Sequence, residues 1–165
     1  MVNNTLEVNN IYHGDCLELM QHIPDKSIDM ILCDLPYGTT ACKWDTIIPF
    51  EPLWEQYERV IKDNGAILLF AQTPFDKVLG ASNLKLLKYE WIWEKTQASG
   101  HLNARKMPMK IHENILVFSK GKPNYYPIME EGEPYSRRTK NCRENNHGFG
   151  INGNISKPNF IQRFK

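Results

Sequence analysis

Four short apolar runs constrain this chain more than any other feature: segments with helical periodicity separate the first three, and a polar loop, Glu94 to Lys110, separates the last two. They occupy residues 28–33, 66–71, 86–93 and 113–119. The first two are short and continuous, as in strands buried on both faces, and the last two are longer and rich in β-formers. Strands that alternate with helices are typical of an α/β fold with a doubly wound, mainly parallel sheet. We expect such a sheet here, preceded by a short strand over Val8–His13.

Amphipathic stripes predict the helices between these strands. Apolar residues recur at helical spacing over Cys16–Ile23, directly after Asp15, which is a good N-cap. A second stripe covers residues 53–61 and ends before Asn64-Gly65. Thr73-Pro74 offers a cap and a first position for a third helix.

The character of the sequence changes after Lys120. Residues 121–165 are rich in Gly, Pro and Asn and have no periodicity, which is typical of a loop-built or partly disordered region. From Lys120 to the end there are nine Lys or Arg and four Glu, a net charge of +5, so the first 119 residues carry −4 of the total of +1. An acidic body with a basic tail is compatible with a polyanionic partner, although a solvated surface often shows the same asymmetry.

Several classes of protein and site are excluded by the residue pattern. The four cysteines form no C-x-x-C pair, and His112-Glu113 has no second histidine at helical spacing, so we predict no metal site. The first residues contain no apolar run of the kind found in signal peptides. No stretch approaches the ~18 apolar residues that cross a bilayer. We expect a reduced, cytoplasmic protein without a membrane partner.

The first long apolar run ends on an acid, a proline and an aromatic ring, in the sequence D-L-P-Y-G over residues 34–38. In an open α/β sheet, ligands bind beyond the carboxyl ends of the strands. Asp34 would accept hydrogen bonds from an incoming amine there, Pro36 would stiffen the turn, and Tyr37 would offer a flat face to a planar group. Alternatively, Asp34 caps a turn and Tyr37 packs at the sheet edge.

Asp34-Leu35-Pro36-Tyr37 resembles the Asp-Pro-Pro-Tyr signature of amino-methyltransferases that act on DNA. The surrounding segment GDCLELMQHIPDKSIDMILCDLPYG resembles the amino-terminal signature of their permuted β-class, and KIHENILVFSK resembles the strand that follows the catalytic region. The resemblance extends over residues 10–120. Leu35 stands where Pro is commoner, but the family uses the backbone carbonyl at that position. The resemblance implies the methyltransferase fold, with a catalytic core over residues 1–120 and the start of a target-recognition region over 121–165.

The resemblance also implies an activity, the site-specific transfer of a methyl group from S-adenosylmethionine to the N6 amine of a flipped adenine in double-stranded DNA. The implied catalytic residues are Asp34, Leu35, Pro36 and Tyr37. The Asp34 carboxylate and the Leu35 carbonyl would hold the two amine N–H groups, and Tyr37 would stack on the base. Because stacking needs the ring and not the hydroxyl, Tyr37→Phe is predicted to be mild.

The residues that contact the cofactor and the identity of the methylated base follow less directly from the resemblance than the catalytic residues do. The resemblance implies that Asp34 and Asp15 lie near S-adenosylmethionine, although a helix cap explains Asp15 equally well. Asp rather than Ser at position 34 favours adenine N6 in this family, and cytosine N4 or a protein glutamine are the alternative amines. Enzymes of this kind accompany restriction systems or are carried by phages.

Basic residues in two loops are candidates for DNA contacts. One group lies between the last two predicted strands, and the other lies in the Gly- and Asn-rich region. The candidates are Arg105, Lys106, Arg137, Arg138, Lys140 and Arg143. Their alternative role is that of an ordinary solvated surface.

In the permuted family, a Phe-x-Gly-x-Gly segment that binds the donor follows the target-recognition region, and we find no such segment in these 165 residues. Gly148–Gly153 matches G-x-G-x-x-G in letters but does not stand between a strand and a helix. We therefore expect an incomplete sheet in which the 28–33 strand has an unpaired edge, covered by a missing carboxyl-terminal half or by a second copy in a homodimer. An inactive or split fragment that serves as a DNA-binding module is the alternative.

Overall fold

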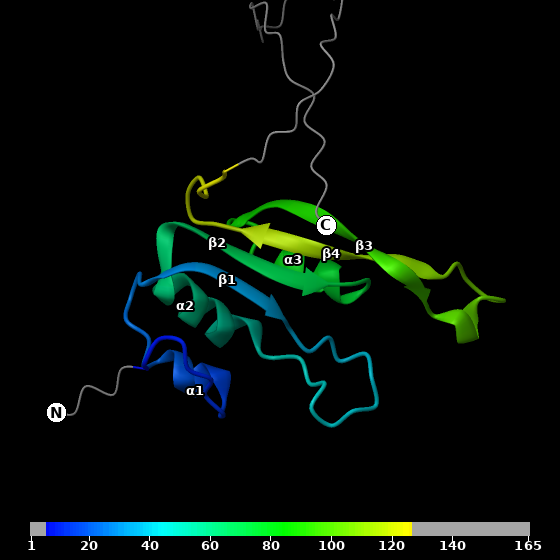
Figure 1. The fold of residues 1–165 in the computed structure, drawn as a ribbon, viewed down its shortest axis with the longest axis horizontal. Coiled ribbons are helices and arrows are strands. Elements are labelled where there is room, and N and C mark those ends of the chain that lie inside the picture. Colours follow the sequence, from blue (N-terminus) through cyan, green and yellow to red (C-terminus); the bar gives the residue numbers. More distant parts are fainter. Residues whose placement is uncertain (1–5, 127–165) are drawn as a thin grey trace, which may run out of the picture. The chain divides into compact units, whose positions relative to one another are not determined.

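The computed structural model describes residues 6–126, which form one four-stranded sheet with helices packed against it (Figure 1). The helices are α1 (Cys16–Met20), α2 (Phe50–Val60), α3 (Phe75–Ser82) and a short 3-10 turn, η1 (His101–Asn103). The strands are β1 (Ile28–Asp34), β2 (Ile61–Ala71), β3 (Leu87–Ser99) and β4 (Lys110–Phe118). All four apolar runs are therefore strands, as predicted. The division of the chain at residue 120 stays a prediction, because the structure describes only six residues beyond it.

The sheet is mixed, so the prediction of a mainly parallel sheet is wrong for the part of the chain that is described. The strand order is β1-β2-β4-β3. Only β1 and β2 are parallel, and β4 runs antiparallel to both of its neighbours. The reason is the connection between β3 and β4, which is a loop with one 3-10 turn instead of a crossover helix. Parallel neighbours need such a crossover, whereas a hairpin joins antiparallel strands.

The predicted strand over Val8–His13 is also wrong, because these residues pair with no strand of the sheet. Val8 and Ile11 are exposed, and the Tyr12 hydroxyl accepts a hydrogen bond of 2.7 Å from the backbone N–H of Glu7. A few apolar residues are not sufficient for a strand, because strand preference depends on packing against neighbouring side chains, and Val8 and Ile11 have no such packing.

Helix α1 begins where predicted but ends at Met20 instead of Ile23. Arg59 of α2 explains how this early end is tolerated. Its guanidinium donates hydrogen bonds of 2.7 Å to the carbonyl oxygens of Met20, the last residue of the helix, and of Ile23 beyond it. The arginine therefore ties α1 to α2.

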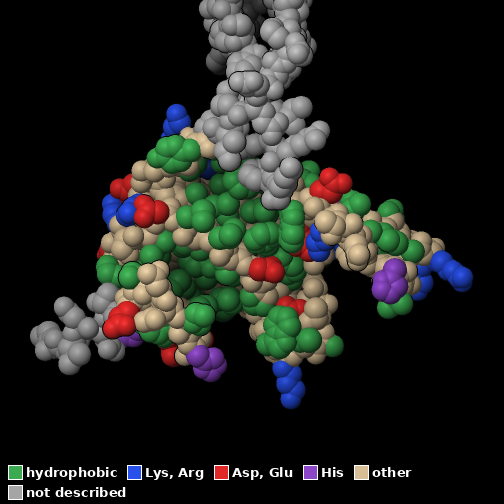
Figure 2. Space-filling view, in the orientation of Figure 1, with side chains coloured by type: hydrophobic (Ala, Val, Ile, Leu, Met, Phe, Trp, Pro, Cys, Tyr) green, Lys and Arg blue, Asp and Glu red, His purple; other side chains and the backbone are tan. Residues whose placement is uncertain are grey.

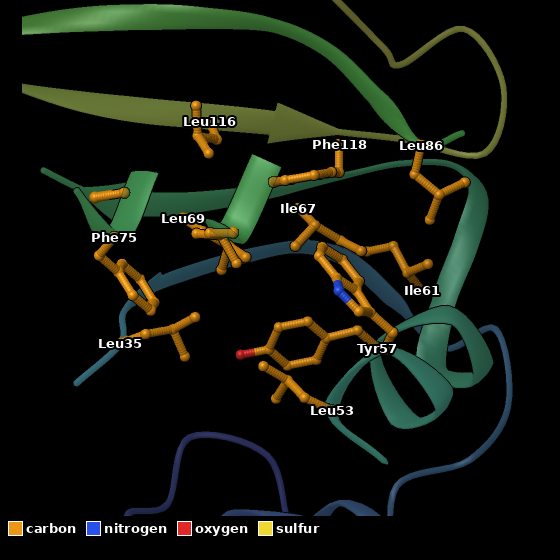
Figure 3. Close-up of a cluster of buried hydrophobic side chains, with 13 residues drawn as sticks. Leu35, Leu53, Tyr57, Ile61, Ile67, Leu69, Phe75, Leu86, Leu116 and Phe118 are labelled. Atoms are coloured by element: carbon orange, nitrogen blue, oxygen red, sulfur yellow. The ribbon is translucent and has the colours of Figure 1, made fainter. Parts of the chain in front are cut away.

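One face of the sheet carries the core, and both α2 and α3 pack on it (Figure 3). Leu53 and Tyr57 of α2 and Phe75 of α3 join Leu69 and Phe118 of the central strands in one buried cluster. None of the helices within residues 6–126 is long and apolar enough to cross a membrane.

The opposite face of the sheet is less covered, and hydrophobic side chains gather over it in Figure 2. Met30 and Leu32 of β1 are each 56% exposed, whereas Ile31 and Cys33 pack toward the core. The prediction that this strand is buried on both faces is therefore wrong within the described residues. In the same part of the chain β1 is an edge strand, which agrees with the expected unpaired edge.

Candidate active site

The D-L-P-Y segment lies at the carboxyl end of β1, where the sequence placed a ligand site. Asp34 is the last residue of β1 and pairs with Phe70 of the parallel strand β2. A pocket of about 370 Å³ opens there, and its lining includes Asp34, Pro36, Tyr37 and Gln72. This volume falls in the range of ~300–1,000 Å³ that is usual for sites that bind small ligands. The two ends of the parallel pair thus form one wall of a site large enough for a planar group.

Asp34 and Tyr37 are joined by a hydrogen bond. The Tyr37 hydroxyl donates to Oδ1 of Asp34 at 2.7 Å. Oδ2 of Asp34 accepts no hydrogen bond from any residue that the structure describes. Burial, and then the hydrogen bond to Asp34 and its negative charge, raise the pKa of the Tyr37 hydroxyl, so it remains a donor at any ordinary pH. The carboxylate is therefore held by one oxygen and keeps the other for a ligand.

The Tyr37 ring has a second neighbour that the sequence did not indicate. It stacks on Phe75 of α3, with ring centroids 5.0 Å apart and an angle of 27° between the ring planes. Phe75 is itself buried in the core. Because one face of Tyr37 rests on Phe75, only the other face can take a stacked base.

Leu35 and Gly38 fix the turn between these groups. The Leu35 side chain is buried in the core cluster, which anchors the segment directly after Asp34 and leaves only the backbone of Leu35 for a ligand. Gly38 has a φ of +65°, and a Cβ atom there would lie 3.0 Å from Cγ1 of Ile47. Both observations explain why the segment ends in glycine.

Asp45 organises the loop that follows and was missed by sequence reasoning. It is buried, and its carboxylate accepts hydrogen bonds from the backbone N–H groups of Gly38 (2.8 Å), Thr39 (2.9 Å) and Thr40 (2.7 Å). The Thr40 side chain has the largest effect, and together with these N–H groups it lowers the pKa of the Asp45 carboxyl to about 2 despite its burial. An acid after a Gly-Thr-Thr segment was the available signal, since Asp often binds nearby backbone N–H groups.

Asp15 is the N-cap of α1, one of its two predicted roles. Its Oδ1 accepts hydrogen bonds from the backbone N–H of Leu17 at 2.8 Å and of Glu18 at 3.4 Å. Cys16 and Cys33, the neighbours of the two acids in the chain, are close enough to influence each other: the pKa of Cys33 is raised by burial first, with a smaller contribution from Cys16. Asp15 does not line the Asp34 pocket, and its role toward a cofactor stays a prediction.

The candidate DNA-binding residues are only partly described. Arg105 and Lys106 are exposed in the turn after η1, within the loop between β3 and β4. Strand pairing between Ser99 and Lys110 carries this loop beyond the sheet end at which Asp34 lies, and neither basic residue lines the Asp34 pocket. The other candidates, Arg137, Arg138, Lys140 and Arg143, and the Gly148–Gly153 segment lie outside the described residues.

Comparison with known proteins identifies the family. Residues 28–160 match the family model described as DNA methylase, which represents N6 and N4 methyltransferases. The chain belongs to this family of DNA amino-methyltransferases. It is 26% identical to the type II methyltransferase M1.MboII of Moraxella bovis over 93% of its own length, and 31% identical to the DNA adenine methyltransferase YhdJ of Escherichia coli over 72%. It spans 62% of the length of the first relative and 44% of the second.

Solved structures agree with the fold of this family. The complex of M1.HpyAVI with S-adenosylmethionine superposes with a TM-score of 0.52 at 19% identity, covering 76% of this chain and 63% of the other. The PvuII DNA methyltransferase, which is specific for cytosine N4, superposes with a TM-score of 0.53 at 16% identity, covering 68% of this chain and 49% of the other. The four-stranded sheet therefore resembles part of the methyltransferase fold, and the likeness does not distinguish adenine from cytosine.

Proposed function

We propose that this chain carries the base-methylation site of an S-adenosylmethionine-dependent DNA methyltransferase that acts on the N6 amine of adenine. The observation that supports the proposal is the free Oδ2 of Asp34 in a pocket beside an aromatic ring. Family membership supports the reaction class. Adenine methyltransferases of this family tend to have Asp rather than Ser at the position of Asp34, and one relative is named as a DNA adenine methyltransferase.

The chemistry explains why these groups are needed. The exocyclic amine of a base is a poor nucleophile because its lone pair is delocalised into the ring, and the base must leave the duplex to reach a pocket. Asp34 Oδ2 would accept one amine N–H and the Leu35 carbonyl the other, which favours a pyramidal nitrogen with a directed lone pair. Tyr37 would hold the base by stacking, so that the amine is oriented for in-line attack.

S-adenosylmethionine would supply the methyl group when bound. Its adenine moiety, near which the resemblance puts Asp15, carries an amine that donates hydrogen bonds, and Asp15 is an exposed acceptor whose Oδ2 takes no hydrogen bond from any described residue. Asp15 can therefore cap α1 through one oxygen and bind that amine through the other. Phosphate contacts would come from Arg105, Lys106 and the basic residues after Lys120, since cations of this kind carry most of the sequence-independent affinity for DNA.

Substitution of Asp34 tests the proposal directly. In the complete enzyme that contains these residues, Asp34→Ala should reduce the rate of methyl transfer to DNA by at least ~10²-fold, as for loss of a preorganised polar group. Asp29→Asn is a matched control, because Asp29 lies on the same strand and pairs with Lys62 on the surface. Near-normal turnover by Asp34→Ala, with folding intact by circular dichroism, contradicts the proposed role.

Analysis of the product decides the base. Methylated DNA digested to nucleosides and measured by mass spectrometry should contain N6-methyldeoxyadenosine. N4-methyldeoxycytidine in its place would keep the role of Asp34 and overturn the choice of adenine. If the chain binds DNA but no methylated nucleoside forms with the complete enzyme, a DNA-binding module becomes the better description.

A further inference from the structure

An exposed tryptophan lies at the rim of the Asp34 pocket. Trp44 is 74% exposed and lines the same pocket as Asp34 and Tyr37. By contrast, Trp54 is buried and its indole N–H donates to Ser82. A large apolar ring that stays in water forgoes the free energy that its burial would supply. Trp44 makes no contribution to the core, so its position at a pocket needs an explanation.

The backbone of the loop that carries Trp44 is ordered by hydrogen bonds within the loop. Asp45, the next residue, binds three successive backbone N–H groups with its buried carboxylate, and its own N–H donates to the carbonyl of Cys42 at 3.0 Å. These bonds close the 38–45 loop on itself. The backbone of Trp44 is therefore fixed at the pocket before any ligand arrives, which reduces the ordering entropy lost on binding.

We propose that Trp44 is a stacking platform for a nucleobase of the DNA strand that enters the Asp34 pocket, and that Asp45 is the residue that positions it. The inference rests on the proposed function, since it takes DNA as the ligand. Every base has a π-face, so an indole binds bases of any sequence. Lys43, the exposed neighbour of Trp44, adds a positive charge beside the ring, which is a usual combination in proteins that bind single strands.

Binding of two single-stranded probes to the full chain separates bases from phosphates. One probe is a labelled oligo(dA), and the other is an abasic strand with the same number of phosphates. Trp44→Ala should weaken binding of oligo(dA) by about 5- to 150-fold, the range expected for one stacked base, and should leave abasic binding unchanged. Trp44→Phe should restore most of the lost affinity. Leu84→Ala is the control, because Leu84 is 68% exposed but precedes β3, whose first residue Leu87 lies at the other end of the sheet.

Asp45 is tested through Trp44. Asp45→Ala should weaken oligo(dA) binding in the wild-type background and should add no base-dependent loss when Trp44 is already Ala, because a positioning residue acts only through the group it holds. Additive losses would assign Asp45 a separate structural role and overturn that half of the inference. Folding of each variant is checked by urea unfolding.

The outcomes distinguish this inference from the proposed function. If wild type prefers oligo(dA) and Trp44→Ala keeps the same preference, or if wild type binds both probes equally, stacking by Trp44 is overturned. If Trp44→Ala removes the preference but Asp34→Ala leaves methyl transfer intact, stacking stands and the proposed catalytic site fails.

Discussion

The hydrogen bond between Tyr37 and Asp34 leads to an expectation that differs from the one drawn from the sequence. Tyr37→Phe keeps the ring on Phe75 but removes the donor that holds Oδ1 of Asp34 at 2.7 Å. A hydrogen bond to a charged group contributes about 1.5–3 kcal/mol, and the lower value applies here because the bond is open to solvent. We expect a loss of about tenfold in kcat/KM, since ~1.4 kcal/mol corresponds to a factor of ten.

Tyr37→Ala should be more severe, because it also removes the ring. The aromatic pair with Phe75 contributes about 0.5–1.5 kcal/mol, and stacking on the base contributes about 1–3 kcal/mol. With the lost hydrogen bond, we expect a reduction of at least ~100-fold. Tyr12→Phe is the matched control, since the Tyr12 hydroxyl bonds only to the backbone of Glu7 within the described residues and does not line the pocket.

Steady-state methylation with the complete enzyme, with kcat and KM measured separately, tests this reasoning. If the hydrogen bond at Oδ1 orients Oδ2 of Asp34 for the transition state, Tyr37→Phe should lower kcat more than it raises KM. The effect should not change with pH near neutrality, because the raised pKa of Tyr37 keeps its hydroxyl protonated. If Tyr37→Phe keeps its activity within twofold of wild type while Tyr37→Ala loses most of its activity, the hydrogen bond is not important for catalysis. The expectation from the sequence, that only the ring of Tyr37 matters, would then hold.

Three further predictions concern the loop, the helix contact and DNA. The pKa of Asp45 is lowered from 3.8 to about 2, so its ionised form stabilises the fold above about pH 4. This contribution is lost as the pH falls through about 2. The difference in urea midpoint between wild type and Asp45→Asn should therefore shrink on acidification. Arg59→Met should lower the free energy of unfolding in urea by about 1.5–3 kcal/mol, because the carbonyls of Met20 and Ile23 lose a charged donor. Arg105→Ala should reduce the slope of log Kd for DNA against log salt by about one, and an unchanged slope would make Arg105 an ordinary surface residue.

The position of the site followed from local features of the sequence. Asp34 ends an apolar run and is followed by Pro36 and Gly38, so both the strand and the turn could be predicted from neighbouring residues. The cap made by Asp15 is local in the same way, because it binds backbone N–H groups two and three residues ahead. Such patterns depend on short-range geometry, which sequence spacing describes well.

What could not be predicted depends on residues far apart in the chain. The stack of Tyr37 on Phe75 needs the first residue of α3, which follows β2, to lie beside the turn after β1, and no spacing rule relates those two residues. The direction of β4 was missed because the apolar runs of β3 and β4 look the same whether strands are parallel or antiparallel. The polar loop between them, with no helical stripe, was the better guide to a hairpin.

The exposed face of β1 is a second case in which local sequence does not identify a contact with a distant part of the chain. Its apolar run indicates how much of the strand should be buried, but it does not say which element covers it. Within the described residues, α2 and α3 cover only the face of Ile31 and Cys33, and Met30 and Leu32 lie open beside a free strand edge. The relatives M1.MboII and YhdJ are longer than this chain, which spans 62% and 44% of them. An apolar edge of this kind binds another chain when nothing covers it, so the identity of the element that pairs with β1 stays a prediction.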